Sequence, residues 1–172
     1  MDAYTSLAQR SIAEYLETGK RIGIPADAPT GMLNKKAGVF VSLHERGNNQ
    51  LRGCIGTFEP TRKSIAEEII HNALSAAFYD PRFLPVGKDE IDNLEIHVDI
   101  LSHPEKIEDI SLLDPKKYGL IVANQRGRRG LLLPDIGVNT VDEQIDICCD
   151  KGGLNRNKDT LSFYRFTVER HY

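Results

Sequence analysis

The chain has 172 residues, a formal net charge of −3, 40% hydrophobic residues and 27% charged residues. This is the profile of one globular domain, with room for a small second lobe. No apolar run approaches the roughly 20 residues that span a bilayer, and the acidic balance argues against a general nucleic-acid binder. The first residues show no apolar signal region, so we expect a cytoplasmic protein. Three cysteines, two of them adjacent, predict reduced thiols and no disulfide framework.

The first part of the chain alternates helical, irregular and strand-like patterns. Apolar residues at helical spacing predict a helix over residues 3–19, with Gly19 as its stop. Glycines and prolines predict an irregular crossing over residues 20–37. Residues 37–60 then have the pattern of a β-hairpin, with its turn at residues 47–49, because Gly and Asn tolerate positive φ.

The alternation of side chains in this hairpin predicts its register. Its two apolar faces are Val39, Val41 and Leu43 on the first strand and Leu51, Gly53 and Ile55 on the second. Pairing them through a three-residue loop places His44 opposite Arg52, and Ser42 opposite Cys54. Leu51 and Ile55 should then point into the core, while Arg52 and Cys54 point the other way.

The second part of the chain predicts further helices and hairpins. The expected elements are a helix at 64–78 with a capping box, a strand at 94–101, a turn-rich connector at 102–118 with at most a short helix, a second hairpin at 119–133, a helix at 141–150 ended by Gly152 and Gly153, and a last strand at 163–169. Pro81 forbids continuation of the first of these helices. Hairpins replace regular βαβ alternation, which favours one α+β domain over residues 1–172, with a mostly antiparallel sheet flanked by helices.

Cys54 is the leading candidate for a reactive residue. A guanidinium stabilises a thiolate, and Arg52 lies on the same predicted strand face. His44 could act as its base or share an anion with Arg52. Gly53 and Gly56 would leave backbone open to a substrate or an oxyanion. The alternative is a small buried residue packed beneath a helix, which is common for free cysteine.

Asp80-Pro81-Arg82 is a second candidate segment. A proline-fixed loop can present a carboxylate and a guanidinium at the mouth of a cleft. The same residues can equally brace the loop and cap helix ends. The sequence leaves both readings open.

Histidines and acids elsewhere give weaker signals. Glu95, His97 and Asp99 share one strand face, for which a solvated outer face is favoured over a metal site. His71 and His103 are expected to be isolated surface residues. No nucleotide-binding glycine loop is present, and the sequence indicates neither a cofactor nor a metal.

Two further groups have structural alternatives. Arg126, Arg128 and Arg129 form a basic hairpin tip, for which a solvated turn is favoured over nucleic-acid binding because no aromatic platform accompanies it. Cys148 shares a helical stripe with core positions, which favours packing over a redox pair with Cys149.

The hexapeptide LRGCIG, Leu51–Gly56, gives the chain a resemblance to a known family. The chain resembles the AMMECR1 domain family, whose hallmark is this hexapeptide. Further matches follow in the family's order: VFVSL at 39–43, YDPRF at 79–83, LEIHVDILSHPE at 94–105, YGLIV at 118–122 and RGLLLP at 129–134. The resemblance spans nearly the whole chain.

The resemblance implies an α+β domain with a larger lobe around an antiparallel sheet, a smaller lobe, and the hexapeptide at a cleft near their boundary. Prokaryotic members are similar to component A of a system with a Memo-like protein and a radical SAM enzyme. The family has no assigned activity, so the cofactor stays unknown. His97, Asp99, His103 and Gly152 depart from the family's pattern, which weakens a metal or catalytic role for the first three.

Two functions fit these observations. In the first, an enzyme or enzyme component uses Cys54 as nucleophile or thiol ligand, His44 as base, and Arg52 and Arg82 as anion clamps, beside Asp80. Its substrate would be a small anionic molecule or a modified side chain of a partner. In the second, a non-enzymatic module docks on a Memo-like or radical SAM protein. A weaker third is a nucleic-acid-associated factor.

Overall fold

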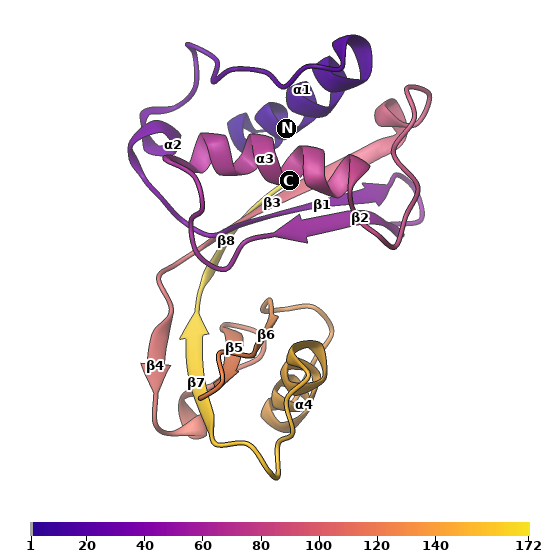
Figure 1. The fold of residues 1–172 in the computed structure, drawn as a ribbon. Helices are drawn as coiled ribbons and strands as arrows, with labels where there is room; N and C mark the ends of the chain where they lie inside the picture. Colours follow the sequence, from indigo (N-terminus) through magenta and orange to yellow (C-terminus); the bar gives the residue numbers. More distant parts are fainter. Residues whose placement is uncertain (1) are drawn as a thin grey trace. The chain divides into compact units, whose positions relative to one another are not determined.

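The computed structural model describes residues 2–172, which fold as helices packed on antiparallel sheets (Figure 1). The chain divides into two compact units. Unit 1 holds the residues up to Ile100 together with Glu169–Tyr172, and unit 2 holds Leu101–Val168. The strands form two four-stranded sheets, with the orders β2-β1-β3-β8 and β4-β7-β5-β6. The predicted α+β class is confirmed, with the strands divided between two sheets.

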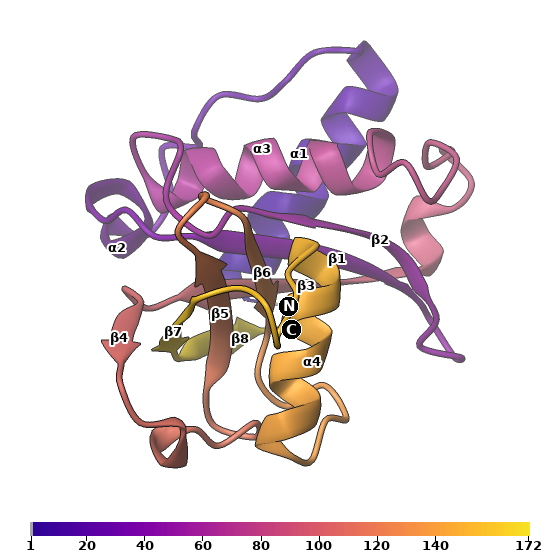
Figure 2. The ribbon, with the colours of Figure 1, turned by 60° about the horizontal axis from the view of Figure 1, so that its bottom comes forward.

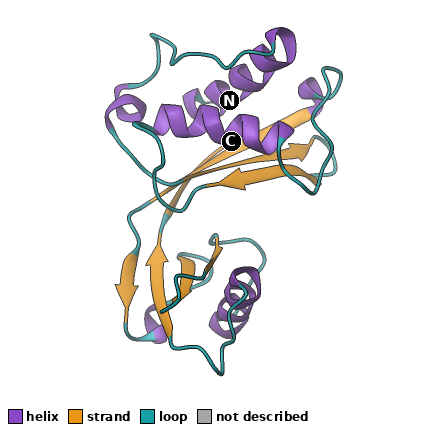
Figure 3. Ribbon diagram, in the orientation of Figure 1, coloured by secondary structure: helices purple, strands orange, loops and turns teal. Residues whose placement is uncertain are grey.

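Unit 1 is built from two long helices on one face of its sheet, as Figure 3 shows. Its elements are α1 (Ala3–Thr18), α2 (Thr30–Asn34), β1 (Val39–Glu45), β2 (Leu51–Gly56), α3 (Ile65–Phe78), the 3-10 turn η1 (Ile91–Asn93), β3 (Leu94–Leu101) and β8 (Val168–His171). Apolar residues of α1, α3, β1 and β3 form one buried core.

The helices of unit 1 begin and end where capping residues satisfy their free backbone groups. Asp2 accepts hydrogen bonds from the first turn of α1, and Gly19 ends that helix in the left-handed region at φ 68°. Ser64 caps α3 by accepting from the Glu67 N–H. The helices predicted at both places are therefore present.

Unit 2 packs one helix against a smaller sheet, as Figure 2 shows. Its elements are β4 (Glu105–Ile107), the 3-10 turn η2 (Ile110–Leu112), β5 (Gly119–Asn124), β6 (Arg129–Leu132), α4 (Val141–Gly152) and β7 (Leu161–Phe166). Leu120, Ile145 and Cys148 lie in its core. An alanine Cβ at Gly130 would lie 1.8 Å from the Cys148 carbonyl oxygen, so only glycine lets α4 approach β6 this closely.

Three elements differ from the sequence-based expectation. The irregular crossing contains α2, and the connector contains the strand β4 beside η2, the short helix that the sequence allowed. The last strand, expected to be continuous, divides at Thr167 into β7 and β8, which belong to different sheets. The main chain of Thr167 bonds instead with Ser102, through N–H to Oγ at 2.9 Å and through its carbonyl oxygen to the Ser102 N–H at 2.9 Å.

The hairpin of β1 and β2 keeps the predicted register over its first half. Ser42 lies opposite Cys54, and Leu43 lies opposite Gly53, as expected. The register then shifts between Leu43 and His44, so that His44 pairs with Leu51 and Arg52 is the extra residue of a β-bulge.

This bulge overturns two predictions. The pairing of His44 with Arg52 is wrong, and Leu51 is 38% exposed instead of lying in the core. A bulge shifts every side chain beyond it to the other face of the strand. The turn is also longer than predicted, because it spans residues 46–50, with positive φ at Gly47 and Asn49.

Candidate functional site

The motif strand β2 lies at the edge of its sheet, where the peptide groups on its outer side have no neighbouring strand. The buried carboxylate of Asp80 supplies a partner for one of them, because its Oδ2 accepts the Cys54 N–H at 2.9 Å. Nη2 of Arg82 donates to the Cys54 carbonyl oxygen at 3.2 Å. The loop after α3 therefore caps this edge of the sheet at Cys54.

Asp80 and Arg82 are also tightly bonded to each other. The Arg82 side chain donates to Asp80 at 3.0 Å from Nε and at 2.8 Å from Nη2, and the Arg82 backbone N–H adds a bond of 3.1 Å. The Arg82 guanidinium holds the pKa of Asp80 far below its usual range, against the opposing effect of burial. Asp80 is thus a permanent anion at neutral pH.

Arg52 binds a second segment of the same loop. Its Nε and Nη2 donate to the two carboxylate oxygens of Glu90 at 2.7 and 3.1 Å, and Nη1 donates to the Leu84 carbonyl oxygen at 3.0 Å. The bond with Arg52 lowers the pKa of Glu90, and the Gly87 N–H contributes to the same effect. We call Arg52, Asp80, Arg82 and Glu90 the hairpin brace.

Sequence reasoning found three members of the hairpin brace and missed Glu90. The bulge directs Arg52 toward a residue 38 positions away in sequence, and no local pattern marks that partner. Arg52 was expected to clamp an anion, and in the structure the carboxylate of Glu90 occupies its guanidinium. Only 12% of the Arg52 side chain is exposed.

The two glycines of the motif serve close packing. A Cβ at Gly53 would lie 2.3 Å from the Ala76 carbonyl oxygen of α3, and a Cβ at Gly56 would lie 2.1 Å from the Phe40 ring. Protein atoms therefore occupy the space above both glycines, where we expected a substrate to approach.

Cys54 itself is half-buried and has no disulfide. The Arg82 guanidinium lies close to Cys54. The pKa of Arg82 is raised chiefly by Asp80, and a negative charge on the Cys54 thiol adds to this effect. On the other side, Ser42 lies opposite Cys54, and its Oγ is 3.2 Å from Nε2 of His44. Burial lowers the pKa of His44, so its imidazole is neutral at pH 7.

The strand face of Glu95, His97 and Asp99 is less solvated than we expected. Asp99 is 5% exposed and accepts a bond of 2.8 Å from Arg170, so the expectation is wrong at this residue. His97 stacks on His44, with ring centroids 4.7 Å apart. Among residues 2–172, no three His, Cys, Asp or Glu side chains form a group that could hold a metal ion.

The remaining candidates lie in unit 2. Cys148 is fully buried, and its Sγ donates to the Leu120 carbonyl oxygen at 3.4 Å, which confirms core packing. Burial raises the pKa of Cys148 to about 12, which disfavours its thiolate at neutral pH. At the exposed basic hairpin tip, Arg128 donates to the Gly153 carbonyl oxygen at 3.0 Å.

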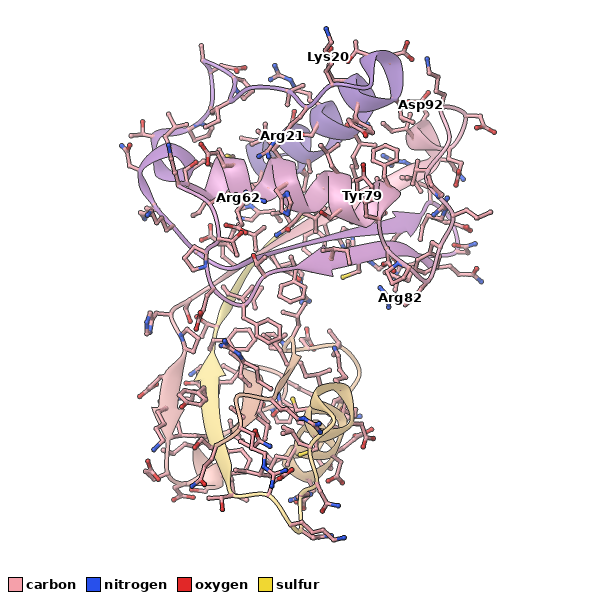
Figure 4. All side chains as sticks on the ribbon, in the orientation of Figure 1. Lys20, Arg21, Arg62, Tyr79, Arg82 and Asp92 are labelled. Atoms are coloured by element: carbon pink, nitrogen blue, oxygen red, sulfur yellow. The ribbon has the colours of Figure 1, made fainter. Side chains whose placement is uncertain are left out.

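The brace holds in place a loop that exposes apolar side chains. Tyr79 is 66% exposed and Leu84 is 83% exposed, and we call residues 79–84 the braced loop. Figure 4 shows Tyr79 at the C-terminal end of α3 and Arg82 further along the same loop. No helix in the described part of the chain is both long and apolar enough to cross a bilayer.

Two known proteins are similar in sequence to nearly the whole of this chain. A protein of Thermotoga maritima is 51% identical over 169 residues, which cover 98% of this chain and 96% of that protein. A protein of Clostridium acetobutylicum is 47% identical over 172 residues, 99% of this chain, although these residues make up only 36% of that longer protein.

A solved structure gives the same fold. The crystal structure of an uncharacterized protein from Pyrococcus horikoshii matches with a TM-score of 0.88 at 37% identity, over 97% of this chain and 88% of that one. The family model of AMMECR1 matches residues 5–171. The predicted resemblance to this family is therefore confirmed, and this chain belongs to the AMMECR1 family.

Proposed function

We propose that the chain is a docking module, and that the braced loop is the surface by which it binds a partner protein. The observation that carries the proposal is the contrast within this loop. The charged groups around it are paired internally, whereas Tyr79 and Leu84 are exposed, with the Tyr79 hydroxyl 3.2 Å from that of Tyr15. Exposed aromatic side chains beside an arginine are typical of interface hot spots.

The brace makes the loop a better binding surface, because a loop that is already ordered loses little conformational entropy on binding. The loop is fixed at Asp80 by Cys54 and at Leu84 by Arg52. Just beyond it, the Val86 N–H donates to the Ala77 carbonyl oxygen at 2.9 Å. The partner we propose is a Memo-like protein or a radical SAM protein, as the family resemblance implies. The longer Clostridium relative supports an assembly role, since this domain there is part of a larger chain.

Affinity capture of a purified Memo-like protein and a purified radical SAM protein from one organism tests this proposal. We expect Leu84→Ser and Tyr79→Ser to weaken binding at least tenfold, since each removes an exposed apolar anchor. Ile136→Ser is the matched control, because Ile136 is an exposed apolar residue of unit 2. Equal binding by all variants, or binding of neither protein by the native chain, would contradict docking through this loop.

A second candidate function is thiol chemistry at Cys54 on a small anionic substrate or a modified side chain. Two observations favour it. The guanidinium of Arg82 lies beside Cys54. On the neighbouring strand, Ser42 lies opposite Cys54, and its hydroxyl contacts the neutral imidazole of His44. A guanidinium beside a thiol favours the thiolate.

The rate of iodoacetamide labelling between pH 6 and pH 9 tests thiol chemistry. We expect Cys54 to react faster than glutathione at pH 7, and Arg82→Gln to remove that advantage. Cys148 and Cys149 are buried and serve as internal controls in the same sample. A Cys54 that labels no faster than glutathione across this range would exclude an activated thiol.

A further inference from the structure

A second polar cluster lies at the other end of α3. A cavity of about 320 Å³ is lined by Arg21, Ile22, Gly23, Ile24, Arg62, Glu67 and Ile70. Its size is at the lower end of small-molecule sites. Figure 4 shows Arg21 and Arg62 beside the first half of α3, while Tyr79 and Arg82 lie at its far end. Residues 67 and 79 are about 18 Å apart at the helical rise, so this cavity is distinct from the hairpin brace.

Arg62 is incompletely satisfied. Its Nε is shielded from solvent and has no hydrogen-bond partner among the described residues. Its Nη2 lies 3.1 Å from Nδ1 and 3.2 Å from Nε2 of His71. A nitrogen nearly equidistant from both ring nitrogens lies off the lone-pair axis of each, so neither contact is a strong hydrogen bond. A buried guanidinium donor without an acceptor is costly, so the chain itself does not fully satisfy this arginine.

His71 is a neutral partner in this cluster. Burial, followed by the charges of Arg62 and then Arg21, lowers the pKa of His71. Both guanidinium groups therefore act on one imidazole. This differs from the sequence-based expectation, which made His71 an isolated surface residue.

Arg21 completes the cationic side of the cavity. It donates from Nη2 to the Glu67 carbonyl oxygen at 3.2 Å, which uses one of the five donors of its guanidinium. The nearby carboxylates already have other partners. Glu68 accepts from Thr57, from Thr61 and from the Arg62 backbone N–H, and Glu67 accepts from the Lys63 N–H at 3.2 Å.

We propose that this cavity binds a small molecule with a phosphate or carboxylate group, held by Arg21 and Arg62 against an apolar wall of Ile22, Ile24 and Ile70. Arginine suits this role because its planar fork matches the oxygens of both groups. The oxyanion would accept from the donors of Arg21 that the Glu67 carbonyl oxygen does not use, beside the guanidinium of Arg62. The site does not depend on the docking function of the braced loop.

NMR titration of the full chain with inorganic phosphate, phenyl phosphate and benzoate tests the site. The readouts are the ring resonances of His71, assigned with His71→Gln, and a dissociation constant for each probe. We expect saturable shifts, a His71 pKa that rises when an anion binds, and tighter binding of the two aromatic probes than of inorganic phosphate. Phenyl phosphate against benzoate separates a phosphate ligand from a carboxylate ligand.

Three variants locate the binding. Arg62→Gln and Arg21→Gln should each weaken binding about tenfold, the loss of one charge-assisted hydrogen bond. Arg126→Gln, at an exposed arginine of the unit 2 hairpin tip, should leave it unchanged. Because Arg21 is exposed, Arg21→Gln should fold normally. It therefore tests the site even if Arg62→Gln fails to fold. The proposal is overturned if 50 mM of every probe leaves His71 unshifted, or if Arg21→Gln and Arg126→Gln bind alike.

Discussion

At the C-terminal end of α3, Arg52 and Arg82 each donate to a carboxylate, whereas at its N-terminal end Arg21 and Arg62 meet a carbonyl oxygen and an imidazole. The two ends use the same residue type under different constraints. Where the carboxylate comes from the chain, the arginine fixes a loop and is not available to a ligand. Where the guanidinium bonds to other groups of the chain and not to a carboxylate, the arginine keeps donors that a ligand can use.

The largest expected effect is at the paired end. Asp80→Ala leaves the Cys54 N–H and the Arg82 side chain without their acceptor, and should lower the free energy of unfolding by about 3 kcal/mol. The folded pKa of Asp80 is lowered, so its stabilisation is present above the unfolded value of 3.8 and is lost as the pH falls below it.

Urea unfolding of the native chain and of Asp80→Ala at pH 7 and at acidic pH measures both effects. The difference between the two proteins should shrink as the pH falls. A difference that is the same at pH 7 and pH 3 would show that the ion pair is not its source.

Backbone packing gives the next largest contrast. Gly53→Ala forces a Cβ to 2.3 Å from the Ala76 carbonyl oxygen, and should cost about 2–3 kcal/mol because helix and strand must separate. Gly23→Ala is the matched control at the other end, since nothing lies within 4 Å of its Cβ. Thermal unfolding compares them. A similar loss in both would mean that α3 does not rest on β2 as tightly as this geometry requires.

The arginines can be compared directly by the same substitution. Arg52→Gln removes two bonds to Glu90 and one to Leu84, and should lower stability by about 1–2 kcal/mol. Arg62→Gln removes a buried donor that has no partner, and should change stability by less than about 0.5 kcal/mol. Chemical unfolding of both variants measures the two changes in the free energy of unfolding. If Arg62→Gln is the more destabilising, Arg62 is a structural residue.

The smallest effect concerns pH. Burial lowers the folded pKa of His71 below the unfolded value of 6.5, so its unfolded form binds protons first and stability falls as the pH drops through that region. His71→Gln should slightly flatten the stability profile between pH 7 and pH 5. His44 shifts in the same direction and is kept in both proteins. If stability depended more steeply on pH in the variant, the folded pKa of His71 would not be the lowered one.

Much of the fold could be predicted because periodic patterns are local. The capping boxes at Ser64 and Thr140 fixed two helix starts, and strict alternation fixed β3 at its observed bounds. The hairpin register could be predicted only as far as Leu43, because the bulge at Arg52 depends on Glu90 and Leu84, far along the chain.

The site was less predictable than the fold for the same reason. Arg52, Cys54, Asp80 and Arg82 were identified from residue types, and the structure brings them together. Their partners follow from tertiary contacts, which residue type does not specify. Arg21, Arg62 and His71 were missed as a group because they come from three separate segments with no shared motif.

The bulge at Arg52 has a consequence for how this hairpin tolerates changes of length. One residue of β2 is surplus to the pairing, so deleting it would restore an unbroken ladder, shorten no other element, and leave Leu51 opposite His44 on the outer face. Such a deletion would make the sheet more regular and at the same time release the loop at Leu84 and Glu90. The bulge therefore connects the strand to the loop after α3, and a hairpin of ideal geometry would lack this connection.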